Sequence, residues 1–188
     1  MPRTLAALAL LLAVGTDARS AEHWQLDADS RLAFEAIQQG AAFEGRFETF
    51  AADIEFSPDD LANSHWQVTV DTGSVNTEYS DRDEVLRDEP FFGVMRWPEA
   101  RFEADQFREL GGDVYEASGR LTLRDQTHPL KFQFTFARSG TTAQLDGEVV
   151  VSRLEFGVGQ GEWSDTTWIG ADVTVRFDVR LTVAAGEY

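Results

Sequence analysis

The most regular feature of this chain is an alternation of apolar and polar residues with a period of two. It recurs in eight runs between Trp24 and Val183. Successive side chains of a β-strand point to opposite faces, so each run predicts a strand with one apolar and one solvent-facing side. The runs cover residues 24–28, 32–36, 52–56, 66–70, 115–123, 130–136, 143–151 and 173–183.

The run over residues 130–136 shows how the alternation assigns the two faces. Its inward set is Leu130 followed by three phenylalanines, and its outward set is entirely polar. The expected buried residues are Phe132, Phe134 and Phe136, and the expected exposed residues are Lys131, Gln133 and Thr135. A register error of one residue would exchange the two sets, so this strand tests the assignment of faces.

Short turn signals separate the runs and predict an antiparallel sheet. They are Gln39-Gly40, Ser57-Pro58-Asp59-Asp60, Gly111-Gly112-Asp113, Asp125-Gln126-Thr127 and Ser139-Gly140. Connections of this length join antiparallel neighbours. About eight strands that share one apolar face can close into a barrel, which leaves no sheet edge exposed. The predicted fold is therefore all-β, a single extended antiparallel barrel of about eight strands. A sandwich of two sheets is the alternative.

One segment interrupts the alternation and predicts the only helix. Residues 77–92 show no period of two, and Ser80 to Arg87 has the composition of a short helix near 80–88. Ser80 is the expected N-cap, acidic residues follow in the first turn, and Arg87 closes the last turn.

The first 20 residues have the features of a secretory signal peptide. A positively charged start at Arg3 precedes an apolar run over residues 4–14, and small residues lead to a cleavage site after Ser20. The run is shorter than the roughly 20 residues that span a bilayer, so no stable membrane insertion is expected. The mature domain would cover residues 21–188 and be periplasmic, or secreted.

Composition excludes several classes of partner and site. The net charge of −17 disfavours nucleic acid and steady docking on anionic lipids. Without cysteine, thiol catalysis and thiolate metal sites are excluded. The histidines, His23, His65 and His128, have no partner at the spacing of metal ligands, so neither a metal nor a cofactor is expected. No phosphate-binding or dinucleotide-binding motif occurs.

The alternation alone does not decide whether the barrel is packed or hollow. The chain has 14 phenylalanines and 5 tryptophans, which favours a dry aromatic core. Small residues on the inward parity leave space beside the large rings or fit the taper of a barrel. These small residues are Ala117, Gly119, Ala143 and Gly147.

In their order along the chain, several motifs resemble those of the YceI-like family of polyisoprenoid-binding proteins. The similarity extends from about Trp24 to Val183. It is carried by Gly45-Arg46-Phe47, Ile54-Glu55-Phe56-Ser57-Pro58, Ser74-Val75-Asn76-Thr77, Arg82-Asp83-Glu84-Val85-Leu86 with Phe91-Phe92, Trp97-Pro98, Gly119-Arg120-Leu121-Thr122-Leu123, Thr127-His128-Pro129-Leu130 and Arg153-Leu154-Glu155-Phe156-Gly157. Asp125-Gln126 and Glu155 depart mildly from the family pattern. The resemblance implies an exported, lipocalin-like barrel that holds a long isoprenoid, either a polyprenyl lipid or an isoprenoid quinone.

This resemblance, together with inward parity, selects candidate ligand-binding residues. The expected cavity wall consists of apolar residues with large side chains: Phe34, Phe91, Phe92, Leu121, Phe132, Phe134, Phe156 and Phe177. Arg82, Asp83 and Arg153 have two interpretations. They form ion pairs that fix the helical segment to the barrel, or an arginine contacts the polar end of the ligand.

Three functions follow as hypotheses. The first is binding, storage or transport of an isoprenoid lipid, with no catalytic residues. The second is a ligand-free stress or interaction protein with a packed barrel, and the third is an isomerase or cyclase acting on a lipid. The oligomeric state stays open, a homodimer included.

Overall fold

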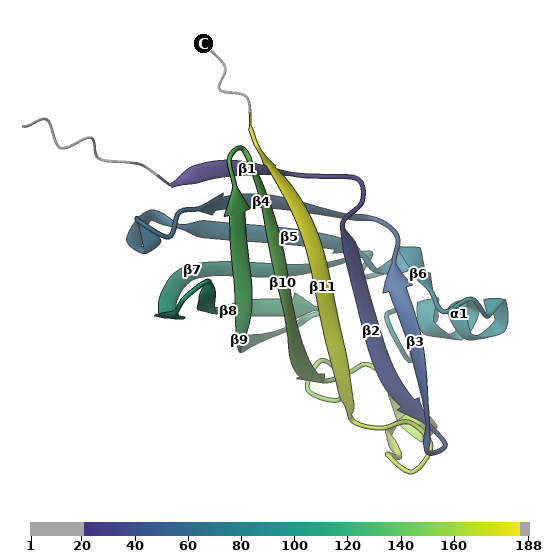
Figure 1. Ribbon diagram of the computed structural model, residues 1–188. Helices are drawn as coiled ribbons and strands as arrows, with labels where there is room; N and C mark the ends of the chain where they lie inside the picture. Colours follow the sequence, from purple (N-terminus) through teal and green to yellow (C-terminus); the bar gives the residue numbers. More distant parts are fainter. Residues whose placement is uncertain (1–20, 185–188) are drawn as a thin grey trace, which may run out of the picture.

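A computed structural model of the protein describes residues 21–184. The predicted signal peptide lies outside the described residues. The described strands form one antiparallel sheet of eleven members that curls into a barrel (Figure 1). Within residues 21–184, no helix has the length and apolar character needed to cross a membrane.

Eight of the strands close into a ring. In order around the ring they are β1 (Glu22–Leu26), β4 (Phe50–Phe56), β5 (His65–Asp71), β7 (Glu99–Gly111), β8 (Val114–Leu123), β9 (Gln126–Ser139), β10 (Thr142–Ser152) and β11 (Asp172–Val183). Strand β1 pairs with both β4 and β11, which closes the barrel. The predicted closed antiparallel barrel is confirmed, and the sandwich of two sheets is excluded.

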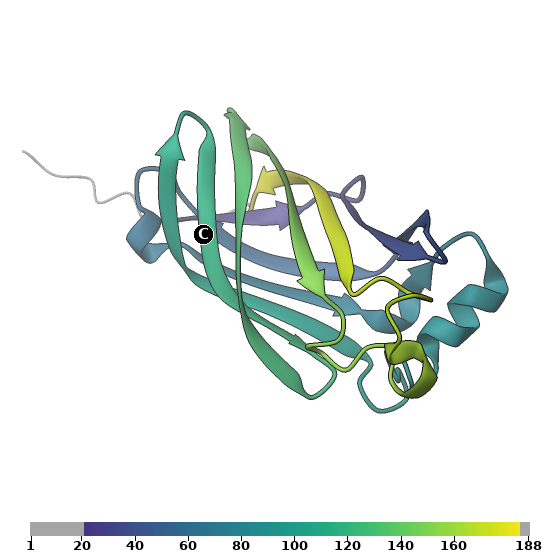
Figure 2. The same cartoon turned by 90° about the horizontal axis from the view of Figure 1, so that it is seen from below.

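Three further strands extend the barrel at one end. They are β2 (Arg31–Gln38), β3 (Ala41–Phe47) and β6 (Val75–Asn76). Strand β2 pairs with β11 over Thr174–Asp178, whereas β1 pairs with it over Leu181–Val183. The helix α1 (Ser80–Arg87) and the short helix η3 (Gly161–Ser164) lie at this extended end (Figure 2). Two other 3₁₀ turns, η1 (Leu61–Asn63) and η2 (Thr72–Ser74), flank β5.

Strand β7 was absent from the predicted runs because its alternation changes phase. Phe102 and Ala104 are buried, but the pairing with β8 shifts between Ala104 and Gln106, and Phe107 then packs against the core. A β-bulge inserts one extra residue and so reverses the parity beyond it. Strand β3 was also missed. Its inward position 45 is a glycine, where a Cβ would lie 2.4 Å from the Phe34 ring.

The predicted faces of β9 are confirmed. Phe134 and Phe136 are buried and Phe132 is partly buried, whereas Lys131, Gln133 and Thr135 are exposed.

Aromatic rings fill the end of the barrel opposite α1. The Phe56 ring lies 4.8–5.9 Å from five others, and such ring pairs each contribute about 0.5–1.5 kcal/mol beyond the apolar area they bury. The five partner rings are those of Trp66, Phe107, Tyr115, Phe134 and Phe136. We call these six residues the ring cluster. The Trp24 indole reinforces this end by donating a hydrogen bond of 2.9 Å to the Phe56 carbonyl.

The small inward residues serve packing and do not open space. Ala117 and Ala143 are buried in the same core as the ring cluster. A Cβ at Gly119 would lie 2.2 Å from the carbonyl oxygen of Glu103, and one at Gly147 would lie 2.3 Å from the Phe177 ring. The interpretation of these residues as space beside large rings is therefore wrong.

Helix α1 is attached to the barrel through backbone groups. Its N-cap residue is Tyr79, so the prediction of Ser80 as the cap is wrong by one residue. The buried Asp83 carboxylate accepts hydrogen bonds from the Thr77 amide (2.8 Å) and hydroxyl (2.7 Å). At the other end, the Arg87 guanidinium donates to the carbonyls of Gly73 (2.8 Å) and Val75 (2.7 Å).

The long loop between β10 and β11 folds around the buried Arg153 side chain. Its guanidinium donates at 2.7–3.2 Å to the carbonyls of Val158, Gly159, Trp163, Ile169 and Gly170. These bonds use all five N–H groups of the side chain. Burial lowers the pKa of Arg153 because the charged form loses its hydration.

Replacing Asp83 with alanine should lower the free energy of unfolding by about 3 kcal/mol. The Thr77 amide and hydroxyl would lose a charged acceptor in a buried position. Urea unfolding measures the change. Glu84→Ala, at the exposed neighbouring position, is the control and should stay within about 0.5 kcal/mol of the unsubstituted protein. Equal effects of the two substitutions would contradict a buried role for Asp83.

Replacing Arg153 with methionine should lower the free energy of unfolding by about 3 kcal/mol or more, since each buried carbonyl left without a donor destabilises the fold by about 1–3 kcal/mol. Arg153→Lys should recover only part of the loss because an ammonium has three donors. The control is Arg176→Met, which removes exposed ion pairs to Glu35 and Glu148 and should cost less than about 1 kcal/mol. Thermal unfolding of the three variants measures these changes. A similar loss of stability in Arg153→Met and Arg176→Met would contradict a buried structural role for Arg153.

Candidate ligand-binding site

An apolar cavity of about 470 Å³ occupies the barrel between the ring cluster and α1. This volume lies within the range of about 300–1,000 Å³ that is typical of small-molecule sites. Strands from the whole circumference line it, and most lining residues are aliphatic or aromatic. Apart from aromatic residues, the polar side chains in the wall are Gln38, Thr72, Asp81, Arg82 and Arg153.

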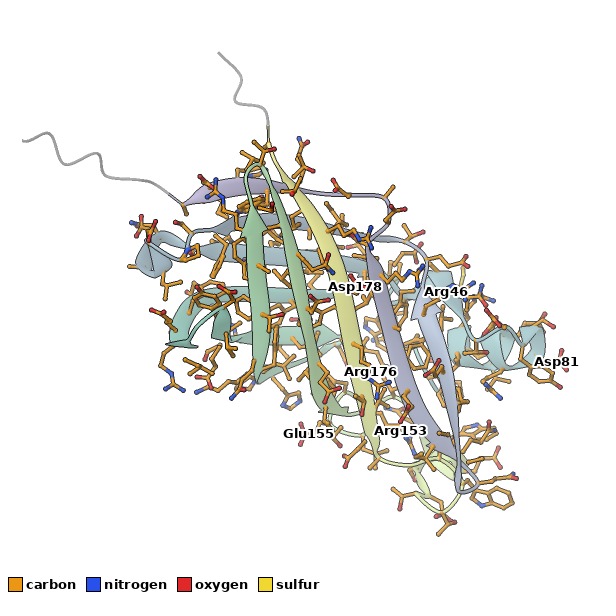
Figure 3. All side chains as sticks on the ribbon, viewed as in Figure 1. Arg46, Asp81, Arg153, Glu155, Arg176 and Asp178 are labelled. Atoms are coloured by element: carbon orange, nitrogen blue, oxygen red, sulfur yellow. The ribbon has the colours of Figure 1, made fainter. Side chains whose placement is uncertain are left out.

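The cavity has a closed floor and an open mouth. At the floor, Ile54, Trp66 and Leu145 are buried and belong to the same core as the ring cluster. Three lining residues are solvent-exposed, namely Tyr79, Asp81 and Val85, and they lie on or next to α1. The mouth therefore opens beside this helix, on which Figure 3 labels Asp81.

Six of the eight expected wall residues line the cavity. They are Phe34, Phe91, Phe92, Leu121, Phe132 and Phe177. Phe134 and Phe156 do not, which corrects that part of the prediction. Phe134 faces inward at the closed end, where its ring lies 4.6 Å from that of Trp66. Phe156 belongs to the loop between β10 and β11, and its ring lies 5.0 Å from that of His128. Inward parity assigns the face of a strand but not the height along the barrel.

The predicted Arg82–Asp83 pair does not form. Asp83 bonds to Thr77, whereas the Arg82 guanidinium lies 4.1 Å above the centre of the Phe43 ring. Arg82 lines the cavity at its mouth, and within residues 21–184 it has no hydrogen bond or ion pair to a protein acceptor. Its N–H groups are available to a ligand.

Two of the other polar side chains in the wall, those of Thr72 and Arg153, are already engaged with backbone carbonyls. Arg153, labelled in Figure 3 near the end of β10, donates all five of its N–H groups to backbone carbonyls. The Thr72 hydroxyl lies 3.0 and 2.9 Å from the carbonyls of Trp97 and Pro98. Both residues shape the site, and Arg153 has no free donor for the polar end of a ligand.

Sequence reasoning missed a second buried arginine. Arg124, in the β8–β9 turn at φ 57°, donates to the carbonyls of Glu89 (2.9 Å), Gly157 (2.8 Å) and Phe91. Burial lowers its pKa, and its guanidinium lies 4.3 Å from the centre of the Trp97 ring. A positive charge in a turn normally faces solvent, so the local sequence contains no signal for this role. In contrast, the wall residues of β3, Phe43 and Phe47, were detectable from their alternation.

Within the described range 21–184, no group of three or more histidine and acidic side chains is placed to hold a metal ion. Of the histidines, His23 lies 3.4 Å from Asp53 on the surface, and the His128 ring bonds to the Glu155 carbonyl at 3.0 Å.

The sequence is similar to curated bacterial proteins over most of its length. A UPF0312 protein of Vibrio parahaemolyticus is 29% identical over 153 residues, covering 79% of this chain and 81% of that protein. A UPF0312 protein of Pseudomonas aeruginosa is 28% identical over 169 residues, covering 84% and 88%.

Solved structures share the architecture. Burkholderia cenocepacia BcnA superposes with a TM-score of 0.80 at 28% identity, covering 82% of this chain and 98% of that one. A polyisoprenoid-binding domain from Saccharophagus degradans, implicated in plant cell wall breakdown, has a TM-score of 0.71 at 17% identity and covers 87% and 99%. The family model of the YceI-like domain matches residues 24–181. The chain therefore belongs to the YceI-like family.

Proposed function

We propose that this protein binds one long isoprenoid lipid and carries or stores it in the periplasm. The observation that carries the proposal is the open apolar cavity inside a closed barrel. A ligand-free barrel with a packed interior does not account for this space. Binding is favoured over catalysis because most lining residues are aliphatic or aromatic, and two of the few polar ones, Thr72 and Arg153, are engaged with backbone carbonyls.

The chemistry of the wall suits an isoprenoid chain. Each buried CH₂ group of such a chain contributes roughly 0.8 kcal/mol, and no directional bond is required. Specificity then rests on length and width more than on polar contacts. A chain longer than the cavity would extend through the mouth beside α1.

Further support comes from the comparisons and from the N-terminus. One structural neighbour of this fold is described as a polyisoprenoid-binding domain. A signal peptide over residues 1–20, which the sequence predicts, would direct the protein to the periplasm, where a water-insoluble lipid needs a carrier. We propose that the polar end of the ligand, a phosphate or a quinone oxygen, lies at Arg82, because its donors at the mouth have no protein acceptor among residues 21–184.

A larger side chain inside the cavity should reduce lipid binding. Ala52 lines the cavity and Ala51, its neighbour on β4, is exposed on the outer face, so Ala52→Leu and Ala51→Leu form a matched pair. We expect Ala52→Leu to weaken binding about tenfold, since overpacking costs about 1–3 kcal/mol once ligand fills the space. Native mass spectrometry and lipid extraction measure occupancy. Equal occupancy in both variants would refute binding at this site.

Arg82→Gln should weaken binding of a polyprenyl phosphate about tenfold and leave a neutral polyprenol unaffected. The substitution removes a charge-assisted hydrogen bond, worth about 1.5–3 kcal/mol. Titration calorimetry with the two ligands measures the difference. Arg101→Gln, at an exposed arginine paired with Glu99 outside the cavity, is the control. If Arg82→Gln weakens both ligands equally, Arg82 supports the mouth and does not contact the polar end.

A further inference from the structure

The surface next to the cavity mouth carries no charge in two adjoining segments. Residues 37–42 and 166–171 contain no acidic or basic side chain, in a protein with a net charge of −17. The first segment is the β2–β3 turn with its flanks, and the second leads into β11. We refer to the two segments together as the neutral tip.

Backbone contacts hold the two segments together as one unit. Gln38 and Ile169 form an antiparallel bridge. The Gln39 amide donates to the Trp168 carbonyl at 2.8 Å, and the Gly170 amide donates to the Ile37 carbonyl at 2.8 Å. Figure 1 shows the β2–β3 turn beside the loop that precedes β11. Since Gln38 and Ile169 also line the cavity, the neutral tip borders the ligand site.

The neutral tip exposes large apolar side chains. Trp168 is 53% exposed and Ile37 is 40% exposed. On or next to α1, Tyr79 and Val85 are 56% and 37% exposed, and both line the cavity. An apolar surface that continues into a ligand cavity indicates an apolar partner rather than water.

We propose that the neutral tip docks on the surface of an uncharged, zwitterionic lipid bilayer, with Trp168 and Ile37 among the headgroups and upper acyl chains. This inference rests on the proposed function, because an isoprenoid chain resides in a membrane before it enters the cavity. Docking lets the chain pass from bilayer to cavity without crossing water. Tryptophan suits this position because its ring is apolar and its N–H is polar.

The acidic charge of the protein favours a zwitterionic bilayer over an anionic one. Helix α1 exposes Asp81 and Glu84 beside the mouth, and the net charge of −17 repels an anionic surface. The neutral tip has no charged side chain of its own, and the carboxylates of Asp165 and Asp172 at the two ends of its second segment add to the repulsion from an anionic surface. The tip can therefore approach a zwitterionic surface more readily than an anionic one. Two inserted side chains give a weak, reversible attachment, which suits a protein that must leave the membrane with its ligand.

Vesicle flotation with phosphatidylcholine tests the inference. The mature protein is compared with Ile37→Ser/Trp168→Ser and with a control, Val150→Ser. Val150 is 59% exposed on β10, is not a cavity residue, and lies outside the neutral tip. We expect the double variant to bind vesicles about tenfold more weakly, in line with two lost apolar side chains, and the control to bind as the unsubstituted protein does. Phosphatidylglycerol in the vesicles should weaken binding of all three.

A second measurement separates this inference from the proposed function. Uptake of a polyprenol from detergent micelles should be the same for the double variant and the unsubstituted protein, because the cavity is intact. Equal vesicle binding by the double variant and the unsubstituted protein, or stronger binding to anionic vesicles, would overturn docking by the neutral tip and leave the carrier function standing.

Sedimentation tests the alternative occupant, a second copy of the chain. If the unsubstituted protein is a dimer and the double substitution dissociates it, the tip is an interface between copies and the membrane inference is wrong. No uptake from micelles by the unsubstituted protein would remove the proposed function itself.

Discussion

The packing of Phe56 against five other rings is the interaction on which the site depends. It fills one end of a barrel that is wide enough to be filled by side chains or to hold one small ligand. Because the rings gather at this end, the barrel can keep its fold while the other end holds a cavity. The aliphatic residues there, among them Val149, Val173 and Val175, line the space without crossing it.

At the open end of the barrel, arginine side chains hold the loops by hydrogen bonds to backbone carbonyls. Arg87, Arg124 and Arg153 bond to backbone carbonyls, and the bonds from Arg153 engage all of its donors. Burying a guanidinium is costly, and desolvation lowers the pKa of Arg124 and Arg153 accordingly. The gain is a fixed loop geometry, since one planar side chain orients several carbonyls at once. The mouth is thereby shaped by the backbone, and among residues 21–184 the Arg82 guanidinium has no protein hydrogen-bond acceptor.

Charged side chains are unevenly distributed over the protein. The net charge of −17 disfavours contact with strongly anionic surfaces. The cavity and the neutral tip are adjoining regions without this charge, apart from the polar residues near α1. A carrier of an apolar chain needs such a continuous path, because every segment of the chain exposed to water during transfer is unfavourable.

The alternation of residues by itself determined the strand faces, because side-chain direction in a strand depends only on parity. The short turns indicated antiparallel strands, and the segment without alternation, residues 77–92, indicated the short helix. The motif order also identified the family that the comparisons show. Height along the barrel is not encoded in parity, and for this reason Phe132 lines the cavity while Phe134, two residues later, packs in the ring cluster. The bulge in β7, the partners of Asp83 and Arg153, and the neutral tip also depend on contacts between segments distant in the chain. Only the tertiary structure decided these features, since each forms where the closed barrel brings separate segments together.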